Sequence, residues 1–313
     1  MIPRTGLAYA GLLLASLCWS GNALVARAFH HAIGPMSLAF WRWALVLLIL
    51  LPVVAVPLWQ RREQLRRNLA RLLVLSALAI VSYNALLYSA ARSTTAINIT
   101  LLTTCLPLAT YLGAGLLLGE WPSRRAWLGM LVATLGLLLL IGQGRLGNLL
   151  ALSFSPGDLL MLVAVLVWAL YSVLLRRWSA QLQMPPGALL GVLVLLGVPM
   201  ILPFYLLELA HAGGFEPSFG NLAAIGYTAL FASLISYLCW NHGIKVVGAA
   251  KAALSSYLMP VFAALFSYLL LGETLQAFHW FGGALIFSGL ALATLPKRTG
   301  LDAGDTPQAK RSA

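Results

Sequence analysis

The sequence predicts an all-α integral membrane protein with ten membrane-spanning helices. Of its 313 residues, 61% are hydrophobic and only 9% are charged, whereas about a quarter of an average soluble domain is charged. Apolar stretches of about 20 residues, long enough to cross a bilayer as helices, recur along the chain. The basic residues behind the net charge of +12 lie in short connections between these stretches. This distribution argues against the concentrated basic face of a nucleic-acid-binding protein.

The expected spans follow the apolar runs in order, each bounded by Gly, Pro or charged residues. The first run ends at an Ala-x-Ala pattern, but it is longer than the core of a signal peptide, so we expect it to be retained as a span. The polar residues 297–313 are expected to form a disordered cytoplasmic tail. The predicted spans are 6–28, 34–58, 69–90, 95–118, 124–143, 157–177, 186–208, 219–241, 250–271 and 276–296.

The distribution of Lys and Arg predicts the orientation. With the N-terminus in the cytoplasm, sixteen of the twenty basic residues fall on the cytoplasmic side and three on the outer side, and Arg42 lies within a span. Positive charge is enriched in cytoplasmic loops. Both termini are therefore expected in the cytoplasm.

The two halves of the chain resemble each other. A shift of 153 positions superimposes the segment 100–136 on 253–289 without a gap, and a shift of 149 superimposes Trp19 on Trp168. These matches predict a duplication into a first repeat, 1–148, and a second repeat, 149–296. Because a unit of five spans is odd, the two copies cross the membrane in opposite senses, which is the architecture of alternating access around a midplane site. The matched residues include Pro107 and Pro260, Trp127 and Trp280, Gly129 and Gly282, and Gly136 and Gly289.

Two prolines lie inside corresponding spans. Pro107 and Pro260 lack the N–H that the carbonyl four residues earlier would accept, which frees the carbonyls of Thr103 and Ser256. In hydrocarbon such a carbonyl needs a hydroxyl, water or ligand. We expect a wettable hinge at each proline, and a packing kink is the alternative.

Aromatic and amide residues recur at helical spacing on spans 1, 3, 6 and 8. Amide side chains do not face lipid without cost, so these faces are expected to point into the bundle and form a polar, aromatic cavity wall. Hydrogen bonding between helices is the alternative for any single residue. The candidates are Trp19, Asn22, Tyr83, Asn84, Tyr88, Trp168, Tyr171, Tyr237 and Asn241, with Trp240 as a weaker member.

Arg42 is the one charge well inside a span. An arginine at this depth is costly without a partner. It either anchors a substrate carboxylate or phosphate, or extends to the outer interface.

The remaining ionisable residues suggest no catalysis and no cofactor. None of the eight carboxylates lies at a midplane, so no coupling carboxylate for a proton or sodium ion is visible. Glu120 and Glu273 are expected to cap the helices that follow them. The three cysteines and five histidines show no metal-ligand spacing. Small-residue spacings suit packing within a monomer, or a homodimer face.

Three stretches carry a family resemblance: "WSGNALVARAF" at 19–29, "GPMSLAFWRW" at 34–43 and "SYLCWNHGIKVVGAAKAALSSYLMPVFAALFSYLLLGETL" at 236–275. They resemble the EamA-type transporters of the drug/metabolite transporter superfamily, and the likeness covers nearly all of 6–296. It implies a ten-helix inverted repeat in the bacterial inner membrane that exports small metabolites. It also implies a central cavity formed by Trp19, Asn22, Tyr83, Asn84, Thr103, Trp168, Tyr171, Tyr237 and Ser256. Arg42 has no counterpart in span 7.

The expected function is therefore export of amino acids, amino-acid-derived compounds such as a metallophore, or toxic cations. The substrate is a small molecule, the environment is the bilayer, and no nucleic acid takes part. A nucleotide-sugar or lipid-linked carrier of the same superfamily is the main alternative. An intramembrane transferase would need clustered Asp, Glu or His at reachable depth, which the sequence does not offer.

Overall fold

The computed structural model describes residues 4–150, 155–271, 274 and 276–294. In these residues every regular element is helical, and ten helical segments are long and apolar enough to cross a membrane. The expected fold class is confirmed, and the expected spans agree with the observed ones to within a few residues. The expected tail 297–313 and the expected cap at Glu273 lie outside the described residues.

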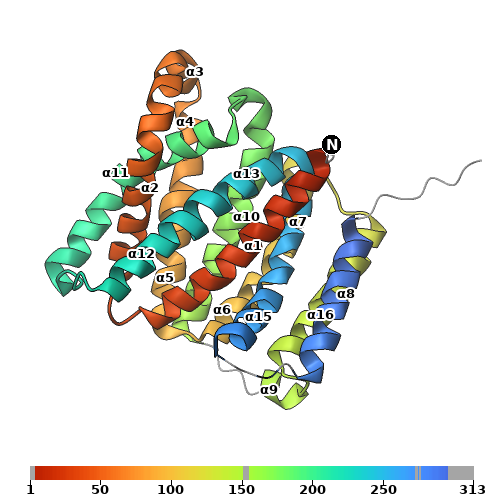
Figure 1. Ribbon diagram of the computed structural model, residues 1–313. Coiled ribbons are helices and arrows are strands. Elements are labelled where there is room, and N and C mark those ends of the chain that lie inside the picture. The colour runs from red at the N-terminus through yellow and green to blue at the C-terminus, as the bar shows by residue number, and fades with distance from the viewer. Residues whose placement is uncertain (1–3, 151–154, 272–273, 275, 295–313) are drawn as a thin grey trace, which may run out of the picture.

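The first five spans include two that are interrupted. A short helix, α3, connects spans 2 and 3, and α9 follows span 5 (Figure 1). The bounds are α1 Arg4–Ala28; α2 Pro35–Gln60; α3 Arg62–Arg67; α4 Leu69–Ser76, π-helix η1 Ala77–Ser82 and α5 Tyr83–Ser93; α6 Ala96–Thr103 and α7 Cys105–Leu118; α8 Arg124–Ile141; and α9 Leu146–Leu150.

The second five spans have the same pattern of continuous and interrupted helices. The sixth and seventh are unbroken, whereas the eighth and ninth each contain a short segment of different helix type. The bounds are α10 Pro156–Leu182; α11 Pro186–Ala212; α12 Phe219–Ala229, π-helix η2 Leu230–Ile235 and α13 Ser236–Val247; α14 Ala249–Ala253, 3₁₀-helix η3 Leu254–Leu258 and α15 Met259–Leu271; and α16 Ala277–Thr294.

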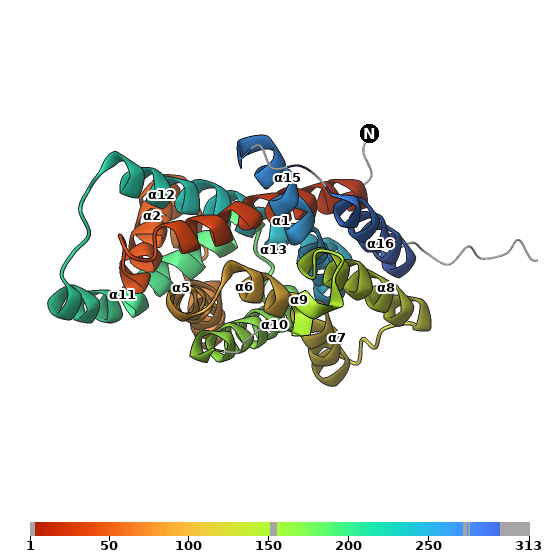
Figure 2. The same ribbon diagram turned by 90° about the horizontal axis from the view of Figure 1, so that it is seen from below.

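Helix pairing relates the two halves. In the end-on view α2 and α11 lie at one edge of the bundle and α8 and α16 at the other, with the remaining spans between them (Figure 2). In the middle, α1 packs on α13 while α10 packs on α5. Exchanging the two halves leaves the α2–α11 and α8–α16 contacts unchanged and converts the α1–α13 contact into the α10–α5 contact.

Glycines permit the closest of these contacts, between α8 and α16. A Cβ placed on Gly136 would lie 2.6 Å from the carbonyl oxygen of Gly282, and one placed on Gly289 would lie 2.5 Å from that of Gly129. The two contacts exchange when the halves are exchanged. The expected use of small residues for packing within the monomer is confirmed at this seam.

The two π-helices occupy corresponding positions. The segment η1 begins at Ala77 and η2 at Leu230, which is the same 153-residue shift that relates the sequences. A π-turn frees backbone carbonyls for side chains and occurs often at functional sites. Both segments lie next to the residues expected to line the central site.

One local expectation is wrong. Ser123, not Glu120, caps α8, since the Ser123 hydroxyl accepts a hydrogen bond from the Ala126 N–H at 3.2 Å. The Glu120 carboxylate instead pairs with Arg176 at 3.6 Å. Hydroxyl caps reach the free N–H groups of a first helical turn directly, and Glu120 lies too far ahead of this turn.

Candidate functional site

Arg42 lies at the centre of the bundle. Its side chain is 1% exposed, so it does not extend to a membrane interface. Its Nε donates to the Ser233 hydroxyl at 2.6 Å, and Nη1 donates to the Asn84 Oδ1 at 2.9 Å and to the Tyr88 hydroxyl. Among the described residues no carboxylate pairs with Arg42, and Nη2 has no hydrogen-bond acceptor. The guanidinium is therefore held by neutral groups and keeps N–H donors available.

The π-helices supply carbonyl oxygens to this centre. The Ala79 carbonyl in η1 accepts from the Tyr237 hydroxyl at 2.8 Å and from the Asn84 amide at 3.0 Å. The Ala232 carbonyl in η2, at the position corresponding to Ala79, accepts from the Trp19 indole N–H at 2.9 Å. Each π-turn thus receives a donor from the opposite half of the chain.

Two tyrosine–asparagine hydrogen bonds connect the helices beside this centre. The Tyr88 hydroxyl donates to the Asn22 Oδ1 at 3.1 Å, and the Tyr171 hydroxyl donates to the Asn241 Oδ1 at 2.6 Å. Exchanging the halves places Asn22 on Tyr171 and Tyr88 on Asn241. The two bonds correspond, with the two residue types exchanged.

Aromatic rings surround the polar centre, with Trp168 in the middle of them. Its ring centroid lies 4.7 Å from that of Tyr83, 5.4 Å from Trp19 and 5.1 Å from Tyr237. Tyr171 and Trp240 are also neighbours, at 5.0 and 5.7 Å. Six of the candidate aromatic residues, from four spans, thus form one contiguous cluster.

The space inside the cluster is small. A void of about 20 Å³ is lined by most of the expected residues, and a void of this size has room for one water molecule. A metabolite can bind there only after the surrounding side chains move apart. The lining residues are Trp19, Asn22, Arg42, Tyr83, Asn84, Leu87, Ile99, Thr103, Tyr237 and Met259.

Thr103 and Ser256 occupy different surroundings. Thr103 lines the void, and its hydroxyl donates to the Ile99 carbonyl at 2.7 Å. The Ser256 hydroxyl donates to the Ala253 carbonyl at 2.9 Å within its own helix, and Ser256 does not line the void. The carbonyls of Ser255 and Met259 accept from Ser16 and Ser20 of α1, both at 2.9 Å.

The helices are irregular just before both prolines. Thr104 separates α6 from α7 three residues before Pro107, and η3 ends at Leu258, two residues before Pro260. The Thr104 backbone N–H donates to the Leu101 carbonyl oxygen at 3.1 Å. This acceptor lies three residues back, as in the tighter 3₁₀-helix. The backbone hydrogen bonding is thus irregular just before each proline.

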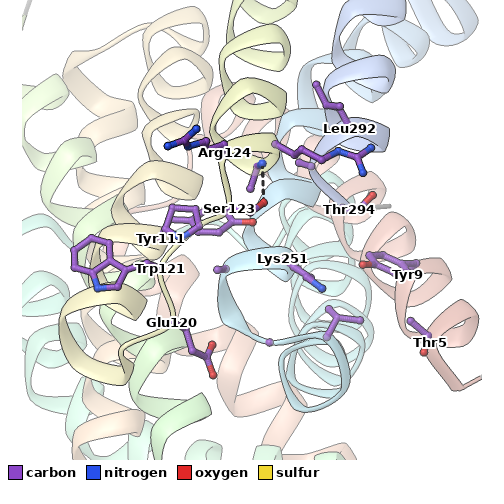
Figure 3. A pocket seen from close by; sticks show the side chains of 17 residues that line it. Thr5, Tyr9, Tyr111, Glu120, Trp121, Ser123, Arg124, Lys251, Leu292 and Thr294 are labelled. Carbon is purple, nitrogen blue, oxygen red and sulfur yellow. Dashed lines mark hydrogen bonds between the residues drawn. The ribbon is translucent and has the colours of Figure 1, made fainter. Parts of the chain in front are cut away.

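A much larger cavity opens at one end of the bundle, with a volume of about 850 Å³ (Figure 3). Tyr9 of α1 and Tyr111 of α7 line it, and Lys251 of α14 and Arg124 of α8 add positive charge. Glu120 lies at its margin, where it pairs with Arg176. This cavity was not expected from the sequence, because its residues come from six different helices, α1, α7, α8, α13, α14 and α16, and from the connection between α7 and α8.

Two further residues of the centre were missed. Ser233 lies in η2 and accepts from Arg42, and the fully buried Trp43 places its ring 5.2 Å from the Arg42 guanidinium carbon. Trp43 directly follows Arg42 in the chain, which is the signal that could have identified it. Groups of His, Cys, Asp or Glu suited to a metal ion do not occur in the part of the chain that the structure describes.

Comparison with known proteins supports a transporter fold. The sequence profile of the EamA-like transporter family matches residues 6–142 and again 155–295. The uncharacterized transporter YyaM of Bacillus subtilis is 30% identical over 260 residues, covering 83% of this chain and 84% of YyaM. The uncharacterized inner membrane transporter YedA of Escherichia coli K12 is 28% identical over 182 residues, covering 58% of this chain and 56% of YedA.

A solved structure shares the fold. One crystal structure superimposes with a TM-score of 0.73 and covers 92% of this chain and 96% of its own, at 22% sequence identity. An uncharacterized transporter of Archaeoglobus fulgidus is 28% identical over 290 residues, covering 90% of this chain and 96% of that relative. The likeness thus extends over the whole bundle.

Proposed function

The chain belongs to the EamA-like transporter family of the drug/metabolite transporter superfamily, and from this premise we propose that it exports small amino-acid-like metabolites by alternating access. It is a membrane transporter, a multi-pass protein of the bacterial inner membrane. In this proposal transport involves no covalent step and no cofactor.

The proposed substrate class rests on the burial of Arg42 and on its neutral hydrogen-bond partners. A guanidinium that is 1% exposed is held by one amide and two hydroxyl groups, and its Nη2 has no acceptor among the described residues. A buried charge without an opposite charge is unfavourable, so a bound carboxylate would stabilise the site. Arginine suits a carboxylate because two of its N–H groups can bind both oxygens.

The aromatic cluster suits the remainder of an amino-acid-like solute. Trp19 and Tyr83 line the void, and the Trp168 ring packs against both of their rings. Such rings contribute apolar contact area, and their faces attract an ammonium group. A zwitterion would place its carboxylate on Arg42 and its ammonium group or side chain against the rings.

The correspondence of the two halves supports the alternating-access part of the proposal. In this reading, residues 1–148 and 149–296 are inverted repeats, and Pro107 and Pro260 are hinges. The exchanged helix contacts, the paired π-helices and the paired tyrosine–asparagine bonds favour it. Two equivalent halves around one central site can present that site to either side of the membrane in turn.

Metabolomics tests the proposal directly. We expect an amino-acid-like solute to accumulate inside a deletion strain and in the medium of an overexpressing strain, relative to the wild type. Accumulation of a nucleotide sugar or a lipid-linked sugar would instead support the alternative carrier class. A solute converted rather than moved would indicate an enzyme.

The role of Arg42 gives the first prediction. Arg42→Met removes the charge, and we expect at least a tenfold loss of export, because hydrogen bonds to charged groups contribute about 1.5–3 kcal/mol each. Arg42→Lys should recover only part of the activity, since a lysine lacks the planar pair of donors. Arg92→Met, at an exposed position on α5, is the matched control and should export normally. Normal export by Arg42→Met at equal membrane abundance would contradict the assigned substrate class.

A further inference from the structure

The two ends of the bundle are packed differently: one contains the large cavity and the other is closed. The large cavity marks one end, where Glu120 pairs with Arg176 near the end of α10. Asp158 lies in the first turn of the same helix. The 18 residues between Arg176 and Asp158 correspond to about 27 Å at 1.5 Å per residue, so Asp158 lies at the opposite end.

Asp158 closes its end of the bundle through a buried network. Its carboxylate accepts from the Thr94 hydroxyl, from the Asn98 amide at 3.1 Å and from the Ser155 N–H at 2.6 Å. Thr94, Asn98 and Asp158 are 4%, 7% and 3% exposed. The network joins the connection between spans 3 and 4, in the first half, to the start of α10, in the second half.

Close backbone packing tightens the same end. A Cβ placed on Gly157 would lie 2.7 Å from the Ala90 carbonyl oxygen and 3.0 Å from the Cβ of Thr94. The start of α10 therefore lies against the end of α5 without space for a solute.

The corresponding residues at the other end are apart. The shifts that relate the halves place Asp158 on Tyr9, Thr94 on Val247 and Asn98 on Lys251. All three of these residues line the large cavity, and Figure 3 shows Tyr9 and Lys251 on the cavity wall. A contact that is closed in one half of the structure is open in the other.

We propose that Asp158, Thr94 and Asn98 form a latch that closes one end of the transport path, and that Tyr9 and Lys251 close the cavity end in the alternate state. The inference rests on the proposed function. In the present state the cavity is the substrate entrance. When the latch opens, the cavity end closes, and the Lys251 ammonium group donates a hydrogen bond to the Tyr9 hydroxyl. The latch residues position the helices and do not bind the substrate.

Cysteine accessibility of the full-length protein in proteoliposomes tests the latch. The native Cys18, Cys105 and Cys239 are replaced by alanine, and Thr103→Cys reports on the central void. A membrane-impermeant maleimide is applied to one face at a time. Separate Thr294→Cys and Ser93→Cys proteins report the cavity end and the latch end. Their labelling identifies which end of the bundle each face of the vesicle membrane exposes.

Opening the latch should raise maleimide labelling from one face of the membrane and lower it from the other. In Asp158→Asn, we expect labelling of Thr103→Cys from the latch end to rise about tenfold and labelling of Thr294→Cys from the cavity end to fall. Asn98→Leu, which keeps the size but removes the amide, should act in the same direction. Glu63→Gln is the control, because it makes the same carboxylate-to-amide change at an exposed site.

Two results would overturn the latch. One is unchanged labelling from the latch end in both variants, and the other is a rise from both ends together, which indicates loosening rather than exchange of states. A disulfide between Tyr9→Cys and Lys251→Cys provides a second measurement. It is expected to form several-fold faster when Asp158→Asn is added than when Asp158 is intact. Equal rates would contradict the reciprocal contact. These readouts need no substrate, so an error in the proposed substrate leaves them unaffected.

Discussion

Two tyrosines whose hydrogen bonds correspond between the halves make unequal contacts at the centre of the protein. Tyr88 and Tyr171 each donate to a buried asparagine, at 3.1 and 2.6 Å. Only Tyr88 also accepts from Arg42. The two halves therefore share a scaffold of hydrogen bonds, while the single positive charge makes the central site asymmetric. An asymmetric site suits a substrate with one anionic end.

Replacing each tyrosine by phenylalanine separates these roles. Tyr171→Phe removes one buried hydrogen bond and should cost about 1–3 kcal/mol of stability. Tyr88→Phe removes two and should cost more. Tyr88→Phe also releases Arg42 and should weaken substrate binding about tenfold, whereas Tyr171→Phe should leave binding within about twofold. Thermal unfolding and binding of the identified solute, measured on the purified proteins, provide the comparison. Equal loss of binding in both variants would show that Arg42 does not depend on Tyr88.

At the scale of elements, the seam between α8 and α16 depends on glycine. Gly129, Gly136, Gly282 and Gly289 bring the two backbones so close that a methyl group meets a carbonyl oxygen or backbone nitrogen. Helices in lipid gain little from the hydrophobic effect against each other and associate through close packing and polar contacts. The seam lies at one edge of the bundle, away from the central site (Figure 2).

Gly136→Ala should therefore destabilise the protein by about 1–3 kcal/mol, as overpacking does in close-packed cores. Gly283→Ala is the matched control, because nothing lies within 4 Å of a Cβ placed there. In a helix interior, alanine is favoured over glycine by about 0.5–1 kcal/mol, so Gly283→Ala should be neutral or slightly stabilising. Thermal unfolding in detergent measures both variants, and equal melting temperatures would show that the backbones can separate without cost.

At the scale of the whole molecule, the sequence predicted the helices well and the contacts less well. The thickness of the bilayer sets the length of every apolar run, so the spans were visible. The 153-residue shift was recognised only for 100–136. The structure extends it to the third and eighth spans, where Asn84 corresponds to Tyr237 and donates to its hydroxyl at 3.3 Å. The π-helices could not be predicted, since their extra residue depends on side chains from other helices, such as the donors to Ala79 and Ala232.

The hydrogen-bond network around Asp158 could not be predicted from the sequence either. In the sequence Asp158 is one of eight carboxylates away from the midplane, and its partners Thr94 and Asn98 lie about 60 residues earlier. No short motif indicates that the two segments meet. Ser233 and Arg42 are even further apart, 191 residues in the chain, and only the folded bundle brings η2 next to α2.

The orientation of the bundle decides which side of the membrane the latch faces. The end that carries the cavity also carries α3, with Arg62, Arg66 and Arg67, and the N-terminal end of α1 (Figure 1). Positive charge is retained in the cytoplasm during insertion, so this end should face the cytoplasm and the Asp158 latch should face outward. In intact cells an impermeant maleimide should label Gly214→Cys, in the exposed connection between α11 and α12 at the latch end, and should leave Glu63→Cys unlabelled until the membrane is made permeable. The reverse pattern would place the cavity outside the cell, and the latch would then close the cytoplasmic end of the path.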